Sequence, residues 1–341
     1  MNYNSIKLIL LLVSIPLLLI VNLALGSVSI PFGDVVGVLM GSDVGENTQI
    51  WHSIIMRTRL PQAMTAVACG AGLSAAGLLM QTVFRNPLAG PSVLGISSAA
   101  SLGVACVVLL SGMIGGGAFS RFGLIGNASL TIAAVVGALL AMMLMVMLSG
   151  RVSGKATLLI VGVMIGYIAS AIVGVLKYFS SEEDIHSYVI WGLGSFARVT
   201  GGQVWLFCLL ILVTLPLALL LSKSLNILLL GNMYAESLGL NVRRARTQTI
   251  IVAGILTALV TAYCGPIMFI GLAVPHICRG IFSTSDHRIL LPATILCGAS
   301  LALICNIIAR MPGFDGALPV NSVTALIGAP ITLRVLLKRR Q

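Results

Sequence analysis

Residues 223–246 read KSLNILLLGNMYAESLGLNVRRAR, and this polar segment separates two long apolar stretches of the chain. It is too polar to cross a membrane, and Gly231 and Gly239 mark the ends of a short helix within it. A short amphipathic helix between two membrane spans can dock into a groove on a partner protein. It can also lie flat on the lipid surface. The segment therefore predicts a helical membrane protein with a surface helix in this loop.

The composition of the whole chain also indicates a membrane protein. Of its 341 residues, 58% are hydrophobic and only 9% are charged, whereas a soluble domain carries about 25% charged residues. These charged side chains are too few to cover a water-facing surface, which excludes a soluble enzyme. The seven cysteines all lie in apolar stretches and form no CxxC pair. We therefore expect no disulfide, no metal site and no cofactor.

Nine apolar runs are long enough to cross a membrane, which takes about 20 residues. A shorter run at 267–282 follows Gly265-Pro266 and is either a short span or a re-entrant segment. Counting it, we predict an all-α polytopic membrane protein with about ten transmembrane helices in a single domain over residues 1–341. The nine longer runs lie at about 6–26, 61–83, 92–114, 124–148, 156–178, 203–222, 248–265, 289–309 and 320–337.

The first run resembles a signal peptide, because Lys7 precedes an apolar stretch from Leu8 to Leu25. That stretch has 18 residues, whereas the apolar part of a signal peptide has about 7–15. We therefore expect an uncleaved first span.

The basic residues predict how the spans are oriented. With a cytoplasmic N-terminus, 14 of the 20 Lys and Arg residues fall on the cytoplasmic side, as the positive-inside rule requires. We therefore predict that both termini are cytoplasmic. The same rule explains the net charge of +11. In a soluble protein that charge would suggest nucleic acid, but here we expect no nucleic-acid partner.

No Asp or Glu lies in the middle of any predicted span. Transporters driven by protons or sodium usually keep an ionisable group within the membrane, so the energy for transport is expected to come from elsewhere. The chain has no GxxxxGK[ST] motif, because the nearest stretch, at 150–156, has the wrong spacing. It cannot bind ATP through a P-loop of its own. An ion-coupled secondary transporter and a structural membrane protein are the alternatives to an ATP-driven transporter.

Six groups of residues occur in a fixed order along most of the chain. They are Arg59-Leu60-Pro61; Arg85-Asn86-Pro87-Leu88-Ala89-Gly90-Pro91 with Leu94-Gly95-Ile96; Trp191 to Ser195; Gly231-x-x-x-Ala235-x-x-Leu238-Gly239; Gly265 to His276 with Arg279 and Asp286-His287-Arg288; and Leu318-Pro319-Val320 with Thr324 to Pro330. Each is weak evidence alone, but in this order they resemble the FecCD family of ABC importer permeases. The resemblance implies the type II ABC importer permease fold.

The resemblance also implies partners and cargo. This chain would form a homodimer in the cell (inner) membrane, surrounded by lipid, with two cytoplasmic ABC ATPase subunits below it. An extracytoplasmic substrate-binding protein would dock from outside. The family carries iron-siderophore complexes, haem or cobalamin. We expect a permease for a ferric siderophore or haem, with cobalamin as the alternative, and no enzyme activity in this chain.

The loop at 223–247 resembles the coupling loop of the family. The matching residues are Gly231, Ala235, Leu238 and Gly239, and Glu236 lies among them as a further candidate for contact with the ATPase. By resemblance, a docked helix at 231–240 would transmit the movement of the ATPases to the spans. Ala235 and Gly239 would allow close approach of the ATPase, and Glu236 would pair with one of its basic residues.

Two arginines match positions where the family meets acidic residues of the binding protein, namely Arg59 and Arg310. The family often has a further Arg where this chain has Gln62, and Arg57 is a candidate to replace it. Exposed ion pairs are individually weak, about 0–1 kcal/mol, but they can orient docking. Anchoring at the membrane interface is the alternative role.

Asn86, Pro87, Gly271, Pro275 and His276 also belong to the family motifs. A lone His beside a proline at the end of a span is a candidate ligand for haem or a metal. We expect a structural hydrogen bond from His276 instead.

The sequence departs from the family pattern near the start of the last span. Ala317 stands where the family has an acidic residue, and Asn321 stands where it has Gly after Leu-Pro-Val. These changes affect the expected outer loop and gate but not the expected fold.

Overall fold

The computed structural model describes residues 3–26, 28, 30–41, 48–113, 123–149, 155–311 and 317–338. All regular elements in these ranges are helical, which confirms the expected all-α fold. Single turns of π-helix (Ile55–Arg59) and 3-10 helix (Pro91–Leu94 and Phe196–Arg198) lie between the longer helices. The α-helices are α1 (Tyr3–Ala24), α2 (Phe32–Leu39), α3 (Thr48–Ile54), α4 (Leu60–Phe84), α5 (Ile96–Met113), α6 (Gly123–Ser149), α7 (Lys155–Tyr178), α8 (Glu182–Gly192), α9 (Gly202–Leu220), α10 (Ser222–Leu229), α11 (Asn232–Ser237), α12 (Val242–Cys264), α13 (Ile270–Phe282), α14 (His287–Ala309) and α15 (Val320–Lys338).

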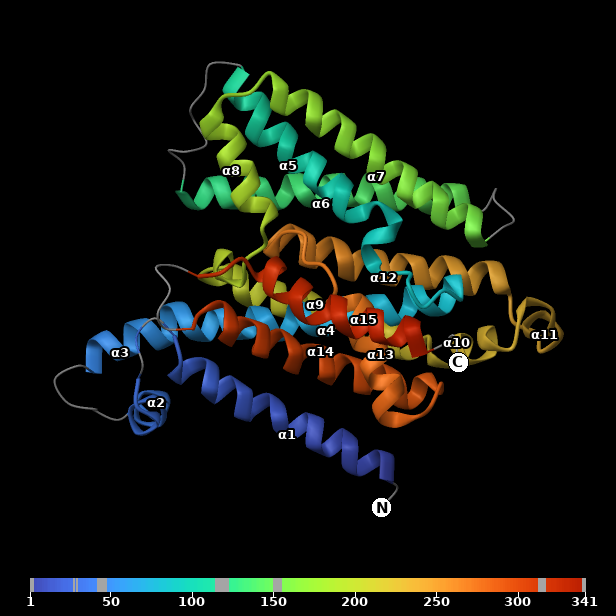
Figure 1. Cartoon of the computed structure of the whole chain (residues 1–341), viewed down its shortest axis with the longest axis horizontal. Helices are drawn as coiled ribbons and strands as arrows, with labels where there is room; N and C mark the ends of the chain where they lie inside the picture. Colours follow the sequence, from blue (N-terminus) through green and yellow to red (C-terminus); the bar gives the residue numbers. More distant parts are fainter. Residues whose placement is uncertain are drawn as a thin grey trace.

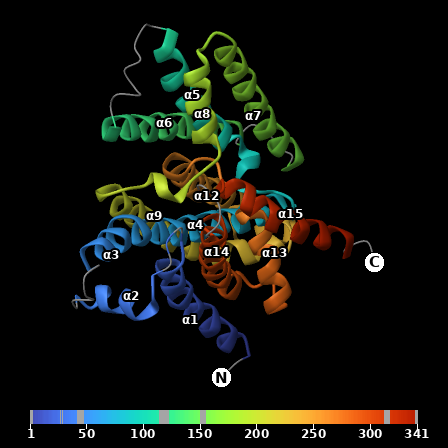
Figure 2. The same cartoon turned by 60° about the vertical axis from the view of Figure 1, so that its left-hand side comes forward.

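Helix α4 lies at the centre of the fold. It packs against α9, α12, α13 and α14, and α1 packs against α14. A second group, α5 to α8, lies on the other side of α12 (Figures 1 and 2), and α5 packs against each of the other three helices in it. In the segment that contains α4, 89% of the most apolar window is buried inside the chain, against 11% in α1. The central helix therefore has little surface left for lipid.

Within the described ranges, seven helical segments are long and apolar enough to cross a membrane. They are α1, α6, α7, α9, α12, α14 and the continuous segment Gln49–Phe84, which contains α4. All seven coincide with runs predicted from the sequence, and the shorter apolar helices α5 and α13 coincide with two more. With 13 residues, α13 is about 20 Å long, which is less than the hydrocarbon core of about 30 Å. The stretch at 267–282 is thus a short apolar helix.

Glycines let α4 pack directly against the backbones of α13 and α14. A β-carbon on Gly77 would lie 1.7 Å from the carbonyl oxygen of Gly271 in α13. A β-carbon on Gly70 would lie 2.2 Å from the carbonyl oxygen of Gly298 in α14. Lipid tails are as apolar as the side chains of the helices. Helices in a membrane therefore associate through close packing. These glycine pairs fix where α13 and α14 cross the central helix.

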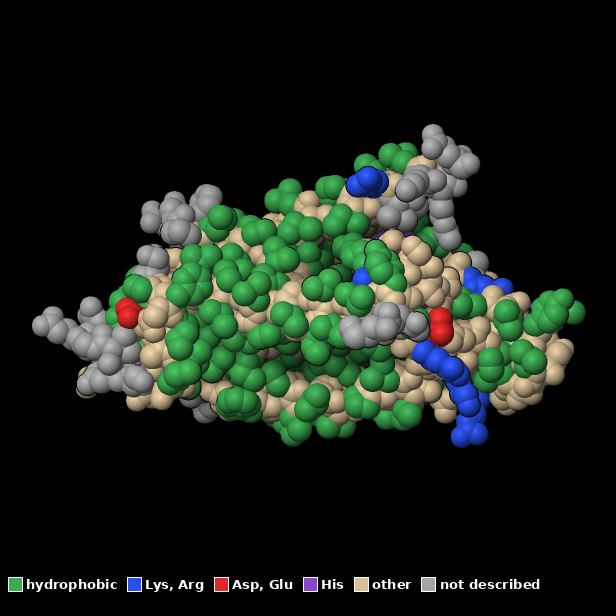
Figure 3. All heavy atoms as spheres, turned by 90° about the horizontal axis from the view of Figure 1, so that it is seen from below, with side chains coloured by type: hydrophobic (Ala, Val, Ile, Leu, Met, Phe, Trp, Pro, Cys, Tyr) green, Lys and Arg blue, Asp and Glu red, His purple; other side chains and the backbone are tan. Residues whose placement is uncertain are grey.

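The two ends of the molecule differ. Figure 1 shows both chain ends on the side where α10 and α11 lie, with α2 and α3 at the opposite side. On the face shown in Figure 3, hydrophobic side chains cover most of the surface, and the visible Lys and Arg side chains lie in the half that contains α10 and α11. An apolar belt with basic residues gathered toward one end is the pattern of a membrane protein.

We predict that Gly77→Ala destabilises the chain by about 1–3 kcal/mol or more, because the new methyl group collides with backbone that cannot rotate away. The matched control is Gly174→Ala in α7, where a β-carbon meets nothing within 4 Å. Thermal unfolding of the purified chain in detergent should show a lower melting temperature for the first variant only. Equal melting temperatures for the two variants would contradict the packing described here.

Candidate functional site

The loop after α9 folds into α10 and α11 before α12 begins. Gly231 precedes α11 with a φ of +117°, and Gly239 follows it with a φ of +80°. Glycine adopts such angles more readily than any other residue, so these two glycines set the ends of α11, where the sequence predicts them. Asn241 then starts α12, because its side-chain oxygen accepts a hydrogen bond of 2.9 Å from the backbone N–H of Arg244.

A small apolar core holds α11 against α10 and α12. Ala235 is fully buried in it, together with Leu228, Val242 and Ala245. The sequence suggested that Ala235 would allow a partner to approach closely. In the structure its methyl group is buried within the chain, so a partner cannot contact it. The small side chain instead lets α11 approach its two neighbouring helices. Ala235 thus supports the loop from inside.

The outward face of α11 is exposed and largely apolar. Met233 is 83% exposed, Tyr234 72% and Leu238 62%, and Glu236 and Gly239 are exposed beside them. Large apolar side chains grouped on a surface mark contact sites for partners. The sequence pattern indicated Leu238 but not Met233 or Tyr234. The side of a six-residue helix that is buried depends on α10 and α12, which the local pattern does not reveal.

Arg85 joins this loop to the central helix. It follows the last residue of α4 with a positive φ of 51°. Its Nη2 donates hydrogen bonds to the carbonyl oxygens of Leu228 at 2.6 Å and Leu229 at 3.1 Å. These carbonyls belong to the C-terminal end of α10, where helices leave carbonyls unpaired and a cation is favourable.

The motif residues between α4 and α13 hold each other in place. The side-chain oxygen of Asn86 accepts a hydrogen bond of 2.9 Å from the backbone N–H of Leu88. Nε2 of His276 lies 2.8 Å from the carbonyl oxygen of Pro87, and since a carbonyl only accepts, this nitrogen carries the proton. The contact has the structural character expected of His276. Within the part of the chain that the structure describes, no group of three or more His, Cys, Asp or Glu could hold a metal.

Gly271 and Pro275, the other two motif residues, lie in α13. A β-carbon on Gly271 would come within 2.7 Å of the carbonyl oxygen of Leu73 and within 2.6 Å of the Pro91 ring. Pro275 is buried inside the same helix. Both residues therefore serve the packing of α13 on α4.

At the opposite end of the molecule, Arg59 is only 2% exposed. Its Nη1 donates to the carbonyl oxygens of Leu23 at 2.6 Å and Ala24 at 2.9 Å, and its Nη2 donates to the carbonyl oxygen of Val28. This guanidinium fastens the segment between α1 and α2 to the start of α4. In the single chain, Arg59 is therefore too buried to contact a binding protein, in contrast to the expectation from the sequence.

Arg57 and Arg310 lie differently. Arg57 is exposed and Arg310 is half-buried. A β-carbon on Gly26 would lie 3.0 Å from Nη2 of Arg59 and 3.0 Å from Nη2 of Arg310, so the two guanidinium groups flank the same glycine. Burial lowers the pKa of Arg310, but an arginine keeps its charge at neutral pH. This end thus carries an exposed Arg57, a half-buried Arg310 and a buried Arg59.

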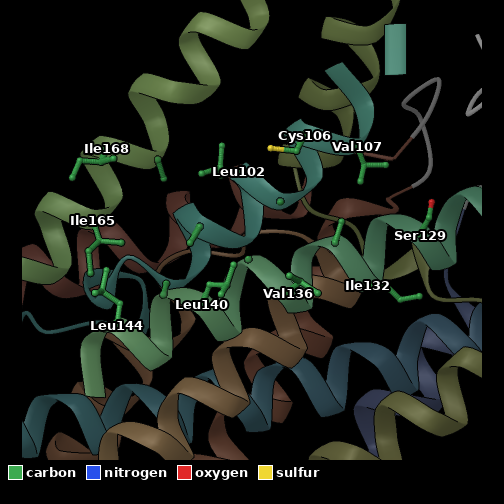
Figure 4. Close-up of a pocket in the computed structure, with 16 residues that line it drawn as sticks. Leu102, Cys106, Val107, Ser129, Ile132, Val136, Leu140, Leu144, Ile165 and Ile168 are labelled. Carbon is green, nitrogen blue, oxygen red and sulfur yellow. The ribbon is translucent and has the colours of Figure 1, made fainter. Parts of the chain in front are cut away.

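An apolar groove of about 720 Å³ runs between α5, α6 and α7. Leu102, Ile132, Leu140 and Ile168 are among its lining residues, and Figure 4 shows their side chains along it. Of the residues in its lining, only Ser129 and Cys106 carry a polar side-chain atom. A ligand site for a charged or polar molecule needs several such groups to orient it, so this groove suits hydrocarbon instead.

The order of the motifs and the helical fold agree with the family comparison, in which residues 10–338 match the FecCD transport family. The chain belongs to this family.

Other members of the FecCD transport family are similar over most of their length. The chain is 36% identical to the hemin transport system permease protein HmuU of Yersinia pestis over 331 residues, 95% of each chain. It is 36% identical to the vitamin B12 import system permease protein BtuC of Escherichia coli O9:H4 (strain HS) over 287 residues, 84% of each chain. A solved structure of a metal-chelate type ABC transporter, in an inward-facing conformation, matches with a TM-score of 0.83 and 29% identity. The match covers 98% of this chain and 100% of that one.

One departure from the FecCD pattern has a visible consequence. The side-chain oxygen of Asn321 accepts a hydrogen bond of 3.1 Å from the backbone N–H of Met268. Its own backbone N–H donates to the carbonyl oxygen of Leu193 at 3.3 Å. Asn321 therefore connects the start of α15 to the loop before α13 and to the end of α8. A glycine there would lack the side-chain bond.

We predict that Arg59→Leu lowers the free energy of unfolding by about 1–3 kcal/mol, because three carbonyls lose a charged donor. Arg57→Leu should change it by less than about 0.5 kcal/mol, since that side chain is exposed. The measurement is thermal unfolding of each purified variant in detergent. If the Arg57 variant proves the less stable of the two, the buried role of Arg59 is wrong.

Proposed function

We propose that this chain is the permease subunit of an ATP-driven importer that moves an iron chelate, either a ferric siderophore or haem, into the cytoplasm. Membership of the FecCD transport family supports the permease role. The hemin permease relative aligns with 95% of this chain and the vitamin B12 relative with 84%, which favours an iron chelate as cargo. A cobalamin importer permease is the second candidate, because the two relatives are equally identical to this chain.

The observation that carries this proposal is the exposed face of α11. Met233, Tyr234 and Leu238 project from a short helix whose other side is locked onto α10 and α12 by the core around Ala235. A rigid helix with a free apolar face can fill a groove on a partner. We infer that the partner is a cytoplasmic ABC ATPase subunit, with Glu236 and Gly239 at the edge of the contact.

The remaining parts of the importer follow from this role. The chain lacks a GxxxxGK[ST] motif, so ATP hydrolysis takes place on the separate ATPase subunits. Two copies of the chain form one transmembrane permease domain each, over residues 1–341, embedded in the lipid of the inner membrane. The loop at 223–247 and both termini face the cytoplasm, in agreement with the excess of basic residues predicted for that side.

The outer face receives the substrate-binding protein. Arg57 and Arg310 supply the positive charge of this face, and Arg59 holds the segment between α1 and α2 in place. Charges at the rim of an interface steer and orient a partner more than they tighten its binding.

Purification of the chain from its native membranes in mild detergent, followed by mass spectrometry, tests the proposal. We expect an ABC ATPase in an equal amount with the chain. The chain recovered alone in repeated mild preparations would favour an ion-coupled secondary transporter.

We predict that the double variant Met233→Asp with Leu238→Asp loses at least about tenfold of the co-purifying ATPase, because charges replace the apolar contact face. Its melting temperature should stay unchanged, since both side chains are exposed in the chain alone. The control is Met40→Asp, which changes a methionine that is 79% exposed at the opposite end. Retention of the ATPase by the double variant would exclude α11 as the docking helix.

A further inference from the structure

A polar network connects the middle of α10 to α14 and to the central helix. The side-chain oxygen of Asn226 accepts a hydrogen bond of 2.8 Å from the backbone N–H of His287 and lies 2.8 Å from Nδ1 of the same residue. Nδ2 of Asn226 donates to Oδ1 of Asp286 at 2.6 Å. Nε2 of His287 lies 2.8 Å from the hydroxyl of Thr82 in α4. One asparagine of α10 thus bonds to the start of α14 directly and is linked to α4 through His287.

The direction of each hydrogen bond follows from the groups themselves. An amide oxygen only accepts, so Nδ1 of His287 carries a proton and donates to Asn226. In a neutral histidine Nε2 can then only accept, and it shares the one proton of the Thr82 hydroxyl with the carbonyl oxygen of Leu78, which lies 2.9 Å from that hydroxyl. Asp286 accepts from Asn226 and from the backbone N–H of Arg288 at 2.9 Å, and these two bonds lower the pKa of its carboxyl group. The network thus joins an ionised Asp286, Asn226 and a His287 that carries a proton on Nδ1.

The network runs from the half-buried Asn226 and Asp286 to a buried end at His287 and Thr82. His287 is 1% exposed and Thr82 is 4% exposed. A buried polar group is costly unless every hydrogen bond is made, and apolar side chains could fill the same space. Polar groups that are buried and fully paired can instead specify one arrangement of the helices they join.

Arg85, which directly follows α4, provides a second link between α4 and α10. It binds the carbonyls at the C-terminal end of α10, while Asn226 binds from its middle. Helix α11 packs against α10 and α12, and both of these helices pack against α4, but only α10 joins α11 to α4 and α14 through these side-chain links. The two links leave α10 little freedom to move without these two helices.

We propose that Asn226 is a positioning residue that transmits movement between α11 and the helix pair α4 and α14. The inference rests on the proposed function, in which the ATPase docks on α11. It assigns a role to Asp286 and His287, a pair that the sequence motif contains without explaining. The signal runs in both directions: a binding protein that docks outside acts on α4 and α14, and the network carries its effect through α10 to the ATPase.

The test uses the complex of this chain with its ATPase and its substrate-binding protein in lipid nanodiscs. The readout is the ratio of ATP hydrolysis rates with and without the binding protein, which needs no identified cargo. Asn226→Asp places a second carboxylate against Asp286 at nearly unchanged size. We expect it to lower the stimulation by at least about fivefold with the ATPase still bound. Adding Asp286→Asn removes the repulsion and should recover more than half of the lost stimulation.

Lys223→Gln, on an exposed position of α10, is the control and should leave the ratio unchanged. The inference would be overturned if both Asn226→Asp and a second variant, Asn226→Leu, were stimulated as strongly as the unchanged complex. A loss in Asn226→Asp that Asp286→Asn fails to restore would also overturn it, since the effect would then come from general loss of structure. Absence of any stimulation in the unchanged complex would instead contradict the proposed function.

Discussion

The backbones of α4, α13 and α14 touch at pairs of glycines, and this contact fixes the centre of the molecule. With no side chains between them, Gly70 meets Gly298 and Gly77 meets Gly271 at distances that exclude even a methyl group. The two ends of the same central helix carry the polar contacts. Arg59 at one end binds the segment after α1, and Thr82 and Arg85 at the other end bind α14 and α10. A close-packed helix held at both ends can pass a displacement along its length.

Apolar and polar groups have different roles in this arrangement. The apolar surfaces of α1, α6 and α7 face outward and suit lipid, and the groove between α5, α6 and α7 has almost no polar lining. Polar side chains also join pairs of helices, as Asn22 of α1 and Asn306 of α14 do. No carboxylate lies within the predicted spans, although transporters driven by protons usually keep an ionisable group within the membrane. We propose that a partner supplies the energy and that it binds the exposed face of α11.

Much of the fold could be predicted from the sequence. Long apolar runs predicted the helices, because a membrane span needs a fixed apolar length. Gly231 and Gly239 predicted the ends of α11, because few other residues adopt their backbone angles. The direction of side chains could not be predicted in the same way. Ala235 faces inward and Arg59 is buried because of helices distant in sequence, and the same holds for the contact between Asn226 and His287.

Uptake into proteoliposomes tests the central claim most directly. The vesicles would contain this chain with its ATPase, with binding protein and a radiolabelled ferric siderophore, haem or cobalamin outside and ATP inside. The account predicts that one of these cargoes accumulates, that accumulation needs both ATP and the binding protein, and that a proton or sodium gradient cannot replace them. Accumulation by this chain alone, driven by such a gradient, would contradict the account.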